Sequence, residues 1–449
     1  MKNENNFSVK KYILKMALPA IAGLSTQMVV SLVDTSMVGR LNEAEYALAA
    51  MGLGVLATWA LISFFSSLST GTHVLVARNF GAGDYEGCGR VLNSSLILTL
   101  IVGIVIGFAG VSSAYSIAHF FAADPQVGNY AGQFLFYRFM GIPFFLVTVA
   151  YRGFFFGIGK TKVFMFSGIL VNLLNIVFNY FLIFGNLGLP RMGVAGSGLG
   201  STLATICEVL FYICVSFYPK YRRKFGYFHN FRFDLGIVKS IYKISIPVSL
   251  QNVFILVAFL SFVAITGLIG TMQQAATQLV ISSIFISLLP CFGFGIAAQT
   301  LVGNNLGSRK LNLARAYAIE TSKLATYYTL VVGAFFLLAP RVILHILTTE
   351  AKVVEVAVPA LRIAGFAQIF YAAGIVLANT LQAAGKTLYV MLSEVLTSWI
   401  LFLPLSYFFG VFLHFGLLGA WGALPLYVLS YTIIVYLKFS KGNWGKITV

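Results

Sequence analysis

Acidic side chains inside apolar stretches are the residues of this sequence most able to do chemistry. The chain has only 13 Asp and Glu residues in 449, and Asp34, Glu208 and Glu394 lie deep within long apolar runs. A carboxylate removed from water is costly to keep ionised, so it takes up a proton or binds a cation. Such a group can couple ion movement to another process. Glu208 and Glu394 lie in the cytoplasmic half, where cavity water or a basic partner would explain them equally well, so their roles stay open.

Three asparagines in one apolar run could share a site with Asp34. Asn172, Asn175 and Asn179 are spaced i, i+3, i+7, which places them on one face of a helix. Asp34 lies about 21 residues after the start of the first apolar run, at roughly 1.5 Å per residue, and therefore in the outer half of the membrane. The run that holds Asn175 and Asn179 also points outward, so we expect these side chains at the same depth.

Thr202 and Gln27 complete the predicted polar cluster. Thr202 falls at a similar depth in the next run, and Gln27 lies two turns before Asp34 on the same helix face. One carboxylate among neutral amides favours a proton carrier, although these oxygens could also hold a weakly bound sodium ion. No catalytic residue and no firm metal site are predicted. The predicted cation-coupling residues are Asp34, Asn175, Asn179 and Thr202, and the predicted supporting or substrate-lining residues are Gln27, Asn172 and Gln251.

Transmembrane helices must position these residues. Of the 449 residues, 59% are hydrophobic and 10% are charged, and the mean hydropathy is +0.89, which is far more apolar than an ordinary soluble domain. A spanning helix needs about 20 apolar residues, so the sequence predicts an all-α polytopic membrane protein with twelve spans and no soluble domain. The predicted spans are 13–39, 44–77, 91–117, 129–156, 163–186, 194–218, 244–268, 273–303, 319–339, 354–382, 388–412 and 415–437.

The spans fall into two related six-helix lobes. Pro19 and Gly39 recur as Pro247 and Gly267 at one constant offset, and three further motifs recur in the same order. Because six is even, both repeats start on the same side, which predicts a pseudo-two-fold axis along the membrane normal. The recurring motifs are Val76–Gly81 with Val302–Gly307, Gly159–Thr161 with Gly385–Thr387, and Gly193–Ser197 with Gly416–Ala420. The predicted domains are an N-lobe (1–218), a cytoplasmic connector (219–243) and a C-lobe (244–449).

The predicted polar cluster belongs to the N-lobe alone. The repeat aligns Asp34 with Phe262, and it aligns the three asparagines with Ser398, Leu401 and Leu405. A structural requirement of the fold would tend to appear in both repeats. The asymmetry therefore favours a functional interpretation of Asp34 over that of a hydrogen-bonded core carboxylate.

The net charge of +17 could suggest a nucleic-acid partner, so the distribution of the basic residues has to decide. Most of the 30 Lys and Arg residues lie in the tails, the connector and the joints on one side. This asymmetry matches the positive-inside rule for a plasma (inner) membrane protein with both termini in the cytoplasm. We therefore expect contact with membrane lipid and not with nucleic acid. Arg138 and Arg362 occupy equivalent repeat positions, which predicts a shared structural role.

Several motifs resemble the multidrug and toxic compound extrusion (MATE) family. The segments Leu18–Gln27 and Leu32–Leu41 look like the first helix of bacterial members. Gly153–Lys160, Asn172–Gly185 and Gly193–Ser197 are similar to the family's fourth to sixth helices. The resemblance therefore covers nearly the whole chain.

The resemblance implies secondary active efflux of small amphipathic, often cationic drugs, driven by inward proton or sodium movement and without a cofactor. The pattern looks closer to the DinF branch than to the NorM branch, because NorM-type acids in the seventh and tenth helices are missing. The seventh span has Gln251–Ile255 instead. DinF-type members with an N-lobe cation site commonly have a second acid where this chain has Asn179, which argues against tight sodium binding.

Together these observations predict a monomeric, proton-coupled antiporter that works by alternating access with Asp34 as its coupling carboxylate. A sodium-coupled antiporter stays open as an alternative. So does a flippase or exporter of a lipid-linked or other amphipathic metabolite, although the few intramembrane arginines argue against a pyrophosphate-binding cavity. An enzyme is not expected, because no Ser/His/Asp, Cys/His or metal-ligand constellation occurs on any joint.

Overall fold

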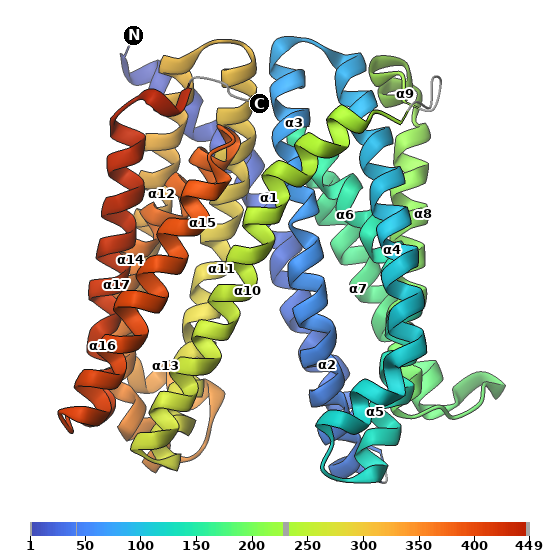
Figure 1. Cartoon of the computed structure of the whole chain (residues 1–449), viewed down its shortest axis with the longest axis vertical. Coiled ribbons are helices and arrows are strands. Elements are labelled where there is room, and N and C mark those ends of the chain that lie inside the picture. The colour runs from blue at the N-terminus through green and yellow to red at the C-terminus, as the bar shows by residue number, and fades with distance from the viewer. Residues whose placement is uncertain (1, 42, 228–232, 446–449) are drawn as a thin grey trace. The chain divides into compact units, whose positions relative to one another are not determined.

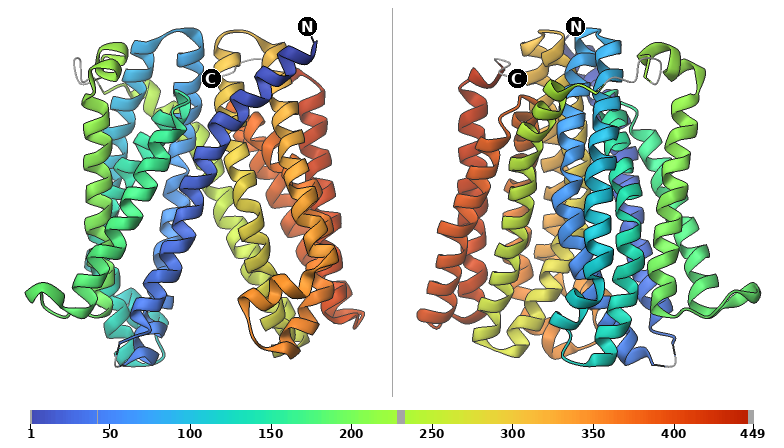
Figure 2. Two further views of the ribbon diagram at one scale, coloured as in Figure 1. Left: turned by 180° about the vertical axis from the view of Figure 1, so that it is seen from behind. Right: turned by 45° about the vertical axis from the view of Figure 1, so that its right-hand side comes forward.

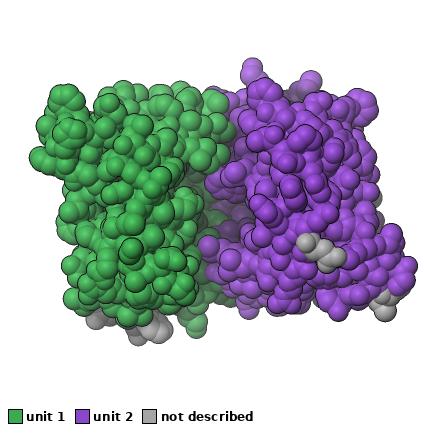
Figure 3. Space-filling view, turned by 90° about the horizontal axis from the view of Figure 1, so that it is seen from below, with its two compact units in different colours: residues 1–21, 250–449 green, residues 22–249 purple. Residues whose placement is uncertain are grey.

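The structure is a computed structural model that describes residues 2–41, 43–227 and 233–445. These residues are mostly α-helical, and no β-strand occurs among them. Residues 228–232 of the predicted connector lie outside the described residues. The chain packs into two compact units: unit 1 comprises residues 1–21 and 250–449, and unit 2 comprises residues 22–249 (Figure 3).

Unit 2 contains the helices drawn from blue to green in Figure 1. Its first helix, α1 (Lys2–Val38), begins in unit 1 and ends in unit 2, and the short 3₁₀ turn Asn186–Gly188 follows α7. The remaining helices of unit 2 are α2 (Ala44–Ser66), α3 (Leu68–Ala82), α4 (Tyr85–Phe121), α5 (Pro125–Met140), α6 (Ile142–Gly157), α7 (Thr161–Phe184), α8 (Val194–Phe217) and α9 (Pro219–Phe225).

Unit 1 contains most of α10 (Leu235–Ile269) and every later helix. The described terminal residues, which both belong to this unit, lie at the same end of it (Figures 1 and 2). Its other helices are α11 (Thr271–Gly307), α12 (Leu311–Leu338), α13 (Pro340–Leu347), α14 (Ala351–Ala383), α15 (Thr387–Leu396), α16 (Leu403–Tyr407) and α17 (Gly416–Ser440), with π-helical turns at Thr397–Phe402 and Phe408–Phe412 and a 3₁₀ turn at Asn443–Gly445.

Every predicted span coincides with a helix or a helix pair. Among the described residues, 11 helices are long and apolar enough to cross a membrane, or up to 12 if a bent pair counts as one span. Several helices extend beyond the predicted limits: α10 begins at Leu235, for example, before the predicted start at 244. The short helices α9 and α13 lie in joints and were not predicted. The predicted all-α polytopic fold is thus confirmed.

The fourth predicted span is the bent pair. Its two halves, α5 and α6, meet at Gly141 with a bend of 47°. Pro143 has no backbone N–H to donate to the carbonyl four residues earlier. The Gly141 N–H bonds to the Arg138 carbonyl oxygen at 3.1 Å, one residue closer than in a regular α-helix. This change frees the carbonyl of Tyr137 for a side-chain donor.

The chain passes from one unit to the other at equivalent points of the repeat. α1 contains Pro19 and passes from unit 1 to unit 2 after Ile21, and α10 contains Pro247 and passes from unit 2 to unit 1 after Ser249. Each proline removes one backbone hydrogen bond within its helix. The predicted domain limits follow the repeated sequence, whereas these packing limits fall just after the two prolines.

Candidate functional site

Asp34 is held by an asparagine of a neighbouring helix within unit 2. The carboxyl group lies on α1 and is 9% exposed. The Asn179 Nδ2 on α7 donates to the Asp34 Oδ1 at 2.8 Å and to the Asn175 Oδ1 at 3.1 Å. Both amide hydrogens of Asn179 are therefore used, one on the carboxylate and one on the neighbouring amide. The structure thus brings together Asp34, Asn175 and Asn179.

The network continues from α7 to α8 through a serine that sequence reasoning missed. The Asn175 Nδ2 donates to the Ser201 Oγ at 2.9 Å. Asn175 and Asn179 are both buried, and α7 and α8 run side by side (Figure 2). The only signal for Ser201 in the sequence was its position directly before Thr202. A continuous chain of hydrogen bonds therefore links Asp34 on α1 to α8.

Thr202 has a different partner from the one predicted. Its Oγ1 donates to the Tyr137 carbonyl oxygen at 2.7 Å, which is the carbonyl freed by the break between α5 and α6. Among the described residues, its hydroxyl makes no hydrogen bond to Asp34 or to the asparagines. Thr202 is buried at the edge of the cluster. Its hydroxyl satisfies a backbone carbonyl of the broken span.

The remaining predicted residues differ in their placement. Asn172 lies one turn from Asn175 and is half-buried, and its Nδ2 has no hydrogen-bond partner. Gln27 is exposed on α1. Gln251 belongs to unit 1, where it is 8% exposed and its Oε1 lacks a hydrogen-bond partner. No described hydrogen bond joins Asn172 or Gln27 to Asp34, and Gln251 belongs to the other unit.

Arg138 lies near Asp34, which its place in the sequence did not reveal. It lies at the end of α5 and interacts electrostatically with Asp34. Its repeat equivalent, Arg362, instead donates from Nε to the Leu337 carbonyl oxygen at 3.2 Å and is exposed. The described contacts of the two arginines differ, and their shared structural role stays a prediction.

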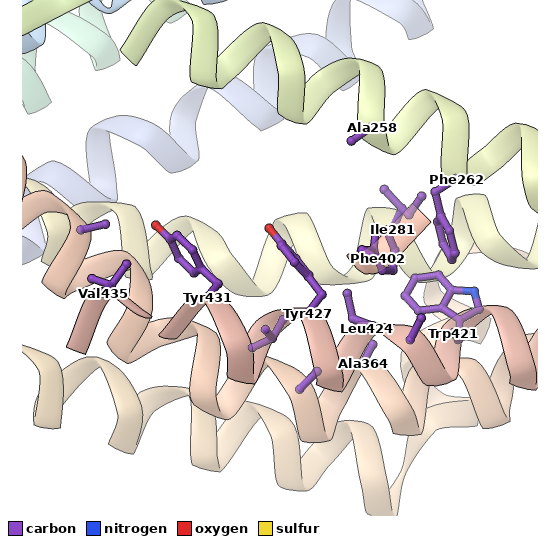
Figure 4. Packing of buried hydrophobic residues seen from close by; sticks show 14 of the residues in the cluster. Ala258, Phe262, Ile281, Ala364, Phe402, Trp421, Leu424, Tyr427, Tyr431 and Val435 are labelled. Carbon is purple, nitrogen blue, oxygen red and sulfur yellow. The ribbon is translucent and has the colours of Figure 1, made fainter. Parts of the chain in front are cut away.

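The repeat position of Asp34 in unit 1 is apolar. Phe262 is 1% exposed and packs against Phe402 and Trp421, with ring centroids 4.8 and 5.1 Å away (Figure 4). Leu405 packs against the same hydrophobic cluster. The Ser398 hydroxyl donates within its own helix, to the Val395 carbonyl oxygen. The predicted restriction of the polar cluster to one lobe therefore holds for the side chains around these positions.

A glycine makes the contact between α7 and α8 possible. A Cβ atom added to Gly200 would lie 2.1 Å from the Asn179 Oδ1 and 3.1 Å from the Asn179 backbone nitrogen. No side chain larger than hydrogen fits there while Asn179 keeps its bond to Asp34. Small residues commonly allow such close approaches between membrane helices.

We expect Gly200→Ala to displace the Asn179 amide and to reduce transport strongly. Overpacking of this kind destabilises a protein by about 1–3 kcal/mol, so thermal unfolding in detergent should also shift downward. The matched control is Gly52→Ala on α2, because a Cβ there meets nothing within 4 Å. Equal transport by the two variants would contradict the role of the Asn179 contact.

Glu208 is neutralised in unit 2 by an arginine. The Arg152 guanidinium donates to both of its carboxylate oxygens, at 3.0 and 3.1 Å, and the Ser167 hydroxyl donates to it at 3.2 Å. Glu208 is 2% exposed. Both oxygens of this buried acid face the Arg152 Nη2, which compensates its charge, so a basic partner explains Glu208.

The oxygens around Asp34 could bind a proton or a metal ion. Among the described residues, no group of three or more His, Cys, Asp and Glu could hold a metal. One carboxylate and amide oxygens offer hard ligands but a single negative charge. The nearby Arg138 opposes a second positive charge.

The 11 or 12 candidate spans of the described residues define a polytopic α-helical membrane protein, with a buried acid–amide network in unit 2. The MatE family model matches residues 19–181 and again residues 247–408. The chain therefore belongs to the MatE family, whose members are transporters and not enzymes. The double match confirms the predicted repeat, since its two starting points are the paired prolines Pro19 and Pro247.

Individual relatives agree with this assignment. The chain is 26% identical over 451 residues to "Probable multidrug resistance protein NorM" of Thermotoga maritima, covering 98% of this chain and 94% of the relative. It is 24% identical to the Bacillus subtilis protein of the same name, covering 98% of both. A solved structure described as "Outward-facing conformation of a multidrug resistance MATE family transporter of the MOP superfamily" has a TM-score of 0.87 at 22% identity, covering 97% of both chains.

Proposed function

We propose that this protein is a proton-coupled antiporter that exports small amphipathic, often cationic compounds, with Asp34 as the coupling carboxylate. The observation that carries the proposal is the contact of the buried Asp34 with the Asn179 amide. The names of the relatives support drug-like substrates. The closer likeness to the DinF branch stays a prediction, because both named relatives are called NorM.

Asp34 can change its charge because opposing effects act on it. Burial disfavours the carboxylate, whereas the hydrogen bond from Asn179 and the charge of Arg138 favour it. A proton can therefore bind to and leave Asp34 as access to water changes.

Protonation of Asp34 would be transmitted along the hydrogen-bond network. A hydrogen bond to an ionised group contributes roughly 1.5–3 kcal/mol, against about 1 kcal/mol for a neutral pair. A proton on Asp34 thus weakens the Asn179 contact and, through Asn175 and Ser201, alters the link from α1 to α7 and α8. This gives the proton a means to change helix packing, which alternating access requires.

Two alternative functions differ in their support. Sodium coupling through Asp34, Asn175, Asn179 and Thr202 is supported by the oxygen ligands but opposed by Arg138. A lipid-linked saccharide flippase needs free intramembrane cations for a pyrophosphate, and Arg152 is already paired with Glu208. We therefore favour the proton antiporter, acting as a monomer without a cofactor in the plasma membrane.

Inverted membrane vesicles test the proposed function. A fluorescent lipophilic monocation should accumulate when an inside-acid pH gradient is imposed and should leave when nigericin collapses that gradient. Equilibration of the dye across the membrane without an imposed gradient would favour a passive channel, and binding of a lipid diphosphate head group by the purified protein would favour the flippase. Either result would contradict the proposal.

We predict that the connector and both termini face the cytoplasm, because the basic residues gather there. In a cysteine-free background, Arg223→Cys should resist an impermeant thiol reagent added outside intact cells and should react after permeabilisation. The matched control is Leu189→Cys in the joint between α7 and α8, which should react from outside. Both side chains are exposed. Labelling of position 223 from outside would reverse the topology and the depth assigned to Asp34.

A further inference from the structure

Unit 1 contains a buried glutamate that is surrounded by tyrosines. Glu394 lies on α15 and is 2% exposed. The Tyr371 hydroxyl of α14 donates to its Oε1 at 3.0 Å, and the Tyr427 hydroxyl of α17 donates to the same oxygen. The Tyr431 hydroxyl, one turn further along α17, also interacts with the carboxyl group. Figure 4 shows the side chains of Tyr427 and Tyr431 on the same side of their helix.

No cation balances Glu394 among the described residues. None of their four ion pairs includes it. The basic residues of the helices packed around it have other contacts: Arg362 of α14 bonds the Leu337 carbonyl, and Lys438 of α17 lies 4.8 Å from the ring centroid of Tyr389 on α15. The titratable groups that face Glu394 are therefore the three tyrosines.

Glu208 in unit 2 provides an internal comparison. Both glutamates are 2% exposed and both accept hydroxyl hydrogen bonds. Only Glu208 has an arginine partner. A buried carboxylate with no countercharge is strongly disfavoured, and hydroxyl donors offset only part of that penalty. Glu394 must therefore bind a positive charge for part of the time.

The packing around Glu394 leaves a proton as the occupant. Tyr427 and Tyr431 are 6% and 1% exposed, and neighbouring aromatic rings lie close to them. The centroid of Tyr371 lies 5.9 Å from that of Tyr431, and the centroid of Phe402 lies 5.4 Å from that of Tyr427. An organic cation would have to displace these rings, whereas a proton needs only one carboxylate lone pair.

We propose that Glu394 is a second proton-binding carboxyl group, located in unit 1 and loaded through the hydroxyl of Tyr371. Tyr371 is the least buried of the three tyrosines. As it passes its hydroxyl proton to the carboxylate, it accepts another proton from a hydronium ion, which is left as water, so Tyr371 ends neutral and Glu394 ends as the uncharged acid. The inference rests on the proposed function only in counting this proton toward transport.

Infrared difference spectroscopy of the purified protein tests this proposal. The wild type should show the C=O stretch of a protonated carboxyl that Glu394→Gln lacks, and this band should disappear as the pH is raised. Glu320→Gln is the matched control, because Glu320 is also buried but is paired with Lys323 at 2.7 Å. A spectrum unchanged by Glu394→Gln would overturn the proposal, as would a band that survives at every pH.

Two further variants keep the test decisive. Tyr427→Phe retains the acid but removes one hydrogen bond, so the frequency of the band should shift even if Glu394→Gln does not fold. An unshifted band would contradict the assignment. Asp34→Asn should leave the Glu394 band in place, so failure of the Asp34 mechanism can be told apart from failure of this inference.

In transport, Glu394→Gln should reduce by one the number of protons exchanged per substrate, and an unchanged ratio would exclude a coupling role.

Discussion

Asp34→Asn is expected to fold and to bind substrate, yet to lose efflux driven by a pH gradient. Asparagine keeps the size of the side chain and can still accept the hydrogen bond that Asn179 donates at 2.8 Å. It cannot take up or release a proton. Efflux in proteoliposomes should therefore fall to the rate of protein-free liposomes, whereas substrate binding in detergent should stay within about threefold of wild type, or less than about 1 kcal/mol.

The control for this variant is Asp124→Asn. Asp124 is an exposed residue that caps α5 by accepting from the backbone N–H groups of Gln126 and Val127. Asparagine is an equally good N-cap, so this change removes one carboxylate without disturbing the helix. It should leave efflux unchanged. Wild-type efflux by Asp34→Asn under the same gradient would eliminate the proposed mechanism.

Asn179→Asp is expected to create sodium binding that the wild type has only weakly. Two carboxylates would then face each other at the position of the present hydrogen bond, and they would repel unless a cation or a proton lies between them. Even in a partly solvated site, a second charge at about 4 Å adds enough attraction for at least a tenfold gain in affinity. Isothermal titration calorimetry with sodium at neutral and acidic pH would measure the gain in sodium affinity and its loss when protons compete for the site.

The control for the added charge is Asn186→Asp, which places a carboxylate in the joint after α7 and outside the polar cluster. It should not change sodium affinity. Adding Asp34→Asn to Asn179→Asp should abolish the gain, because only one carboxylate would remain. Tight sodium binding by the wild type that does not depend on Asp34 would place the cation site elsewhere.

Much of the fold was predictable because membrane helices leave a strong signal in the sequence. Twelve apolar runs coincide with the helices and helix pairs, and the pairing of Pro19 with Pro247 matches the two starts of the family domain. The i, i+3, i+7 spacing of the asparagines correctly predicted that Asn175 and Asn179 share a face. Counting residues along the spans placed Asn179 at the depth of Asp34, and the two side chains share a hydrogen bond.

Other features depended on packing that no spacing rule reveals. Thr202 bonds the Tyr137 carbonyl because α5 ends at Gly141, a break that becomes visible only once the helices are placed. Gly200 looks like any helix glycine until Asn179 lies against it. Glu208 and Glu394 appear alike in the sequence, and only the structure separates the one with an arginine from the one among tyrosines.

Irregular backbone hydrogen bonding within the spans could not be predicted from the sequence either. The π-helical turns around Pro404 keep α15 and α16 in one span, because the backbone adjusts locally where the proline cannot donate. Apolar composition predicts that a span exists but not how its backbone hydrogen bonds shift. Residues near Asp34 can lie beside such irregularities, as Arg138 and Tyr137 do beside the break at Gly141.

The most direct test of proton coupling is efflux of a lipophilic monocation from proteoliposomes in which pH and sodium gradients are imposed separately. We predict that a pH gradient alone drives efflux by the wild-type protein, that a sodium gradient alone at equal pH does not, and that Asp34→Asn responds to neither. Full efflux under a sodium gradient alone, or pH-driven efflux that survives in Asp34→Asn, would contradict the assignment of Asp34 as the proton-coupling carboxylate.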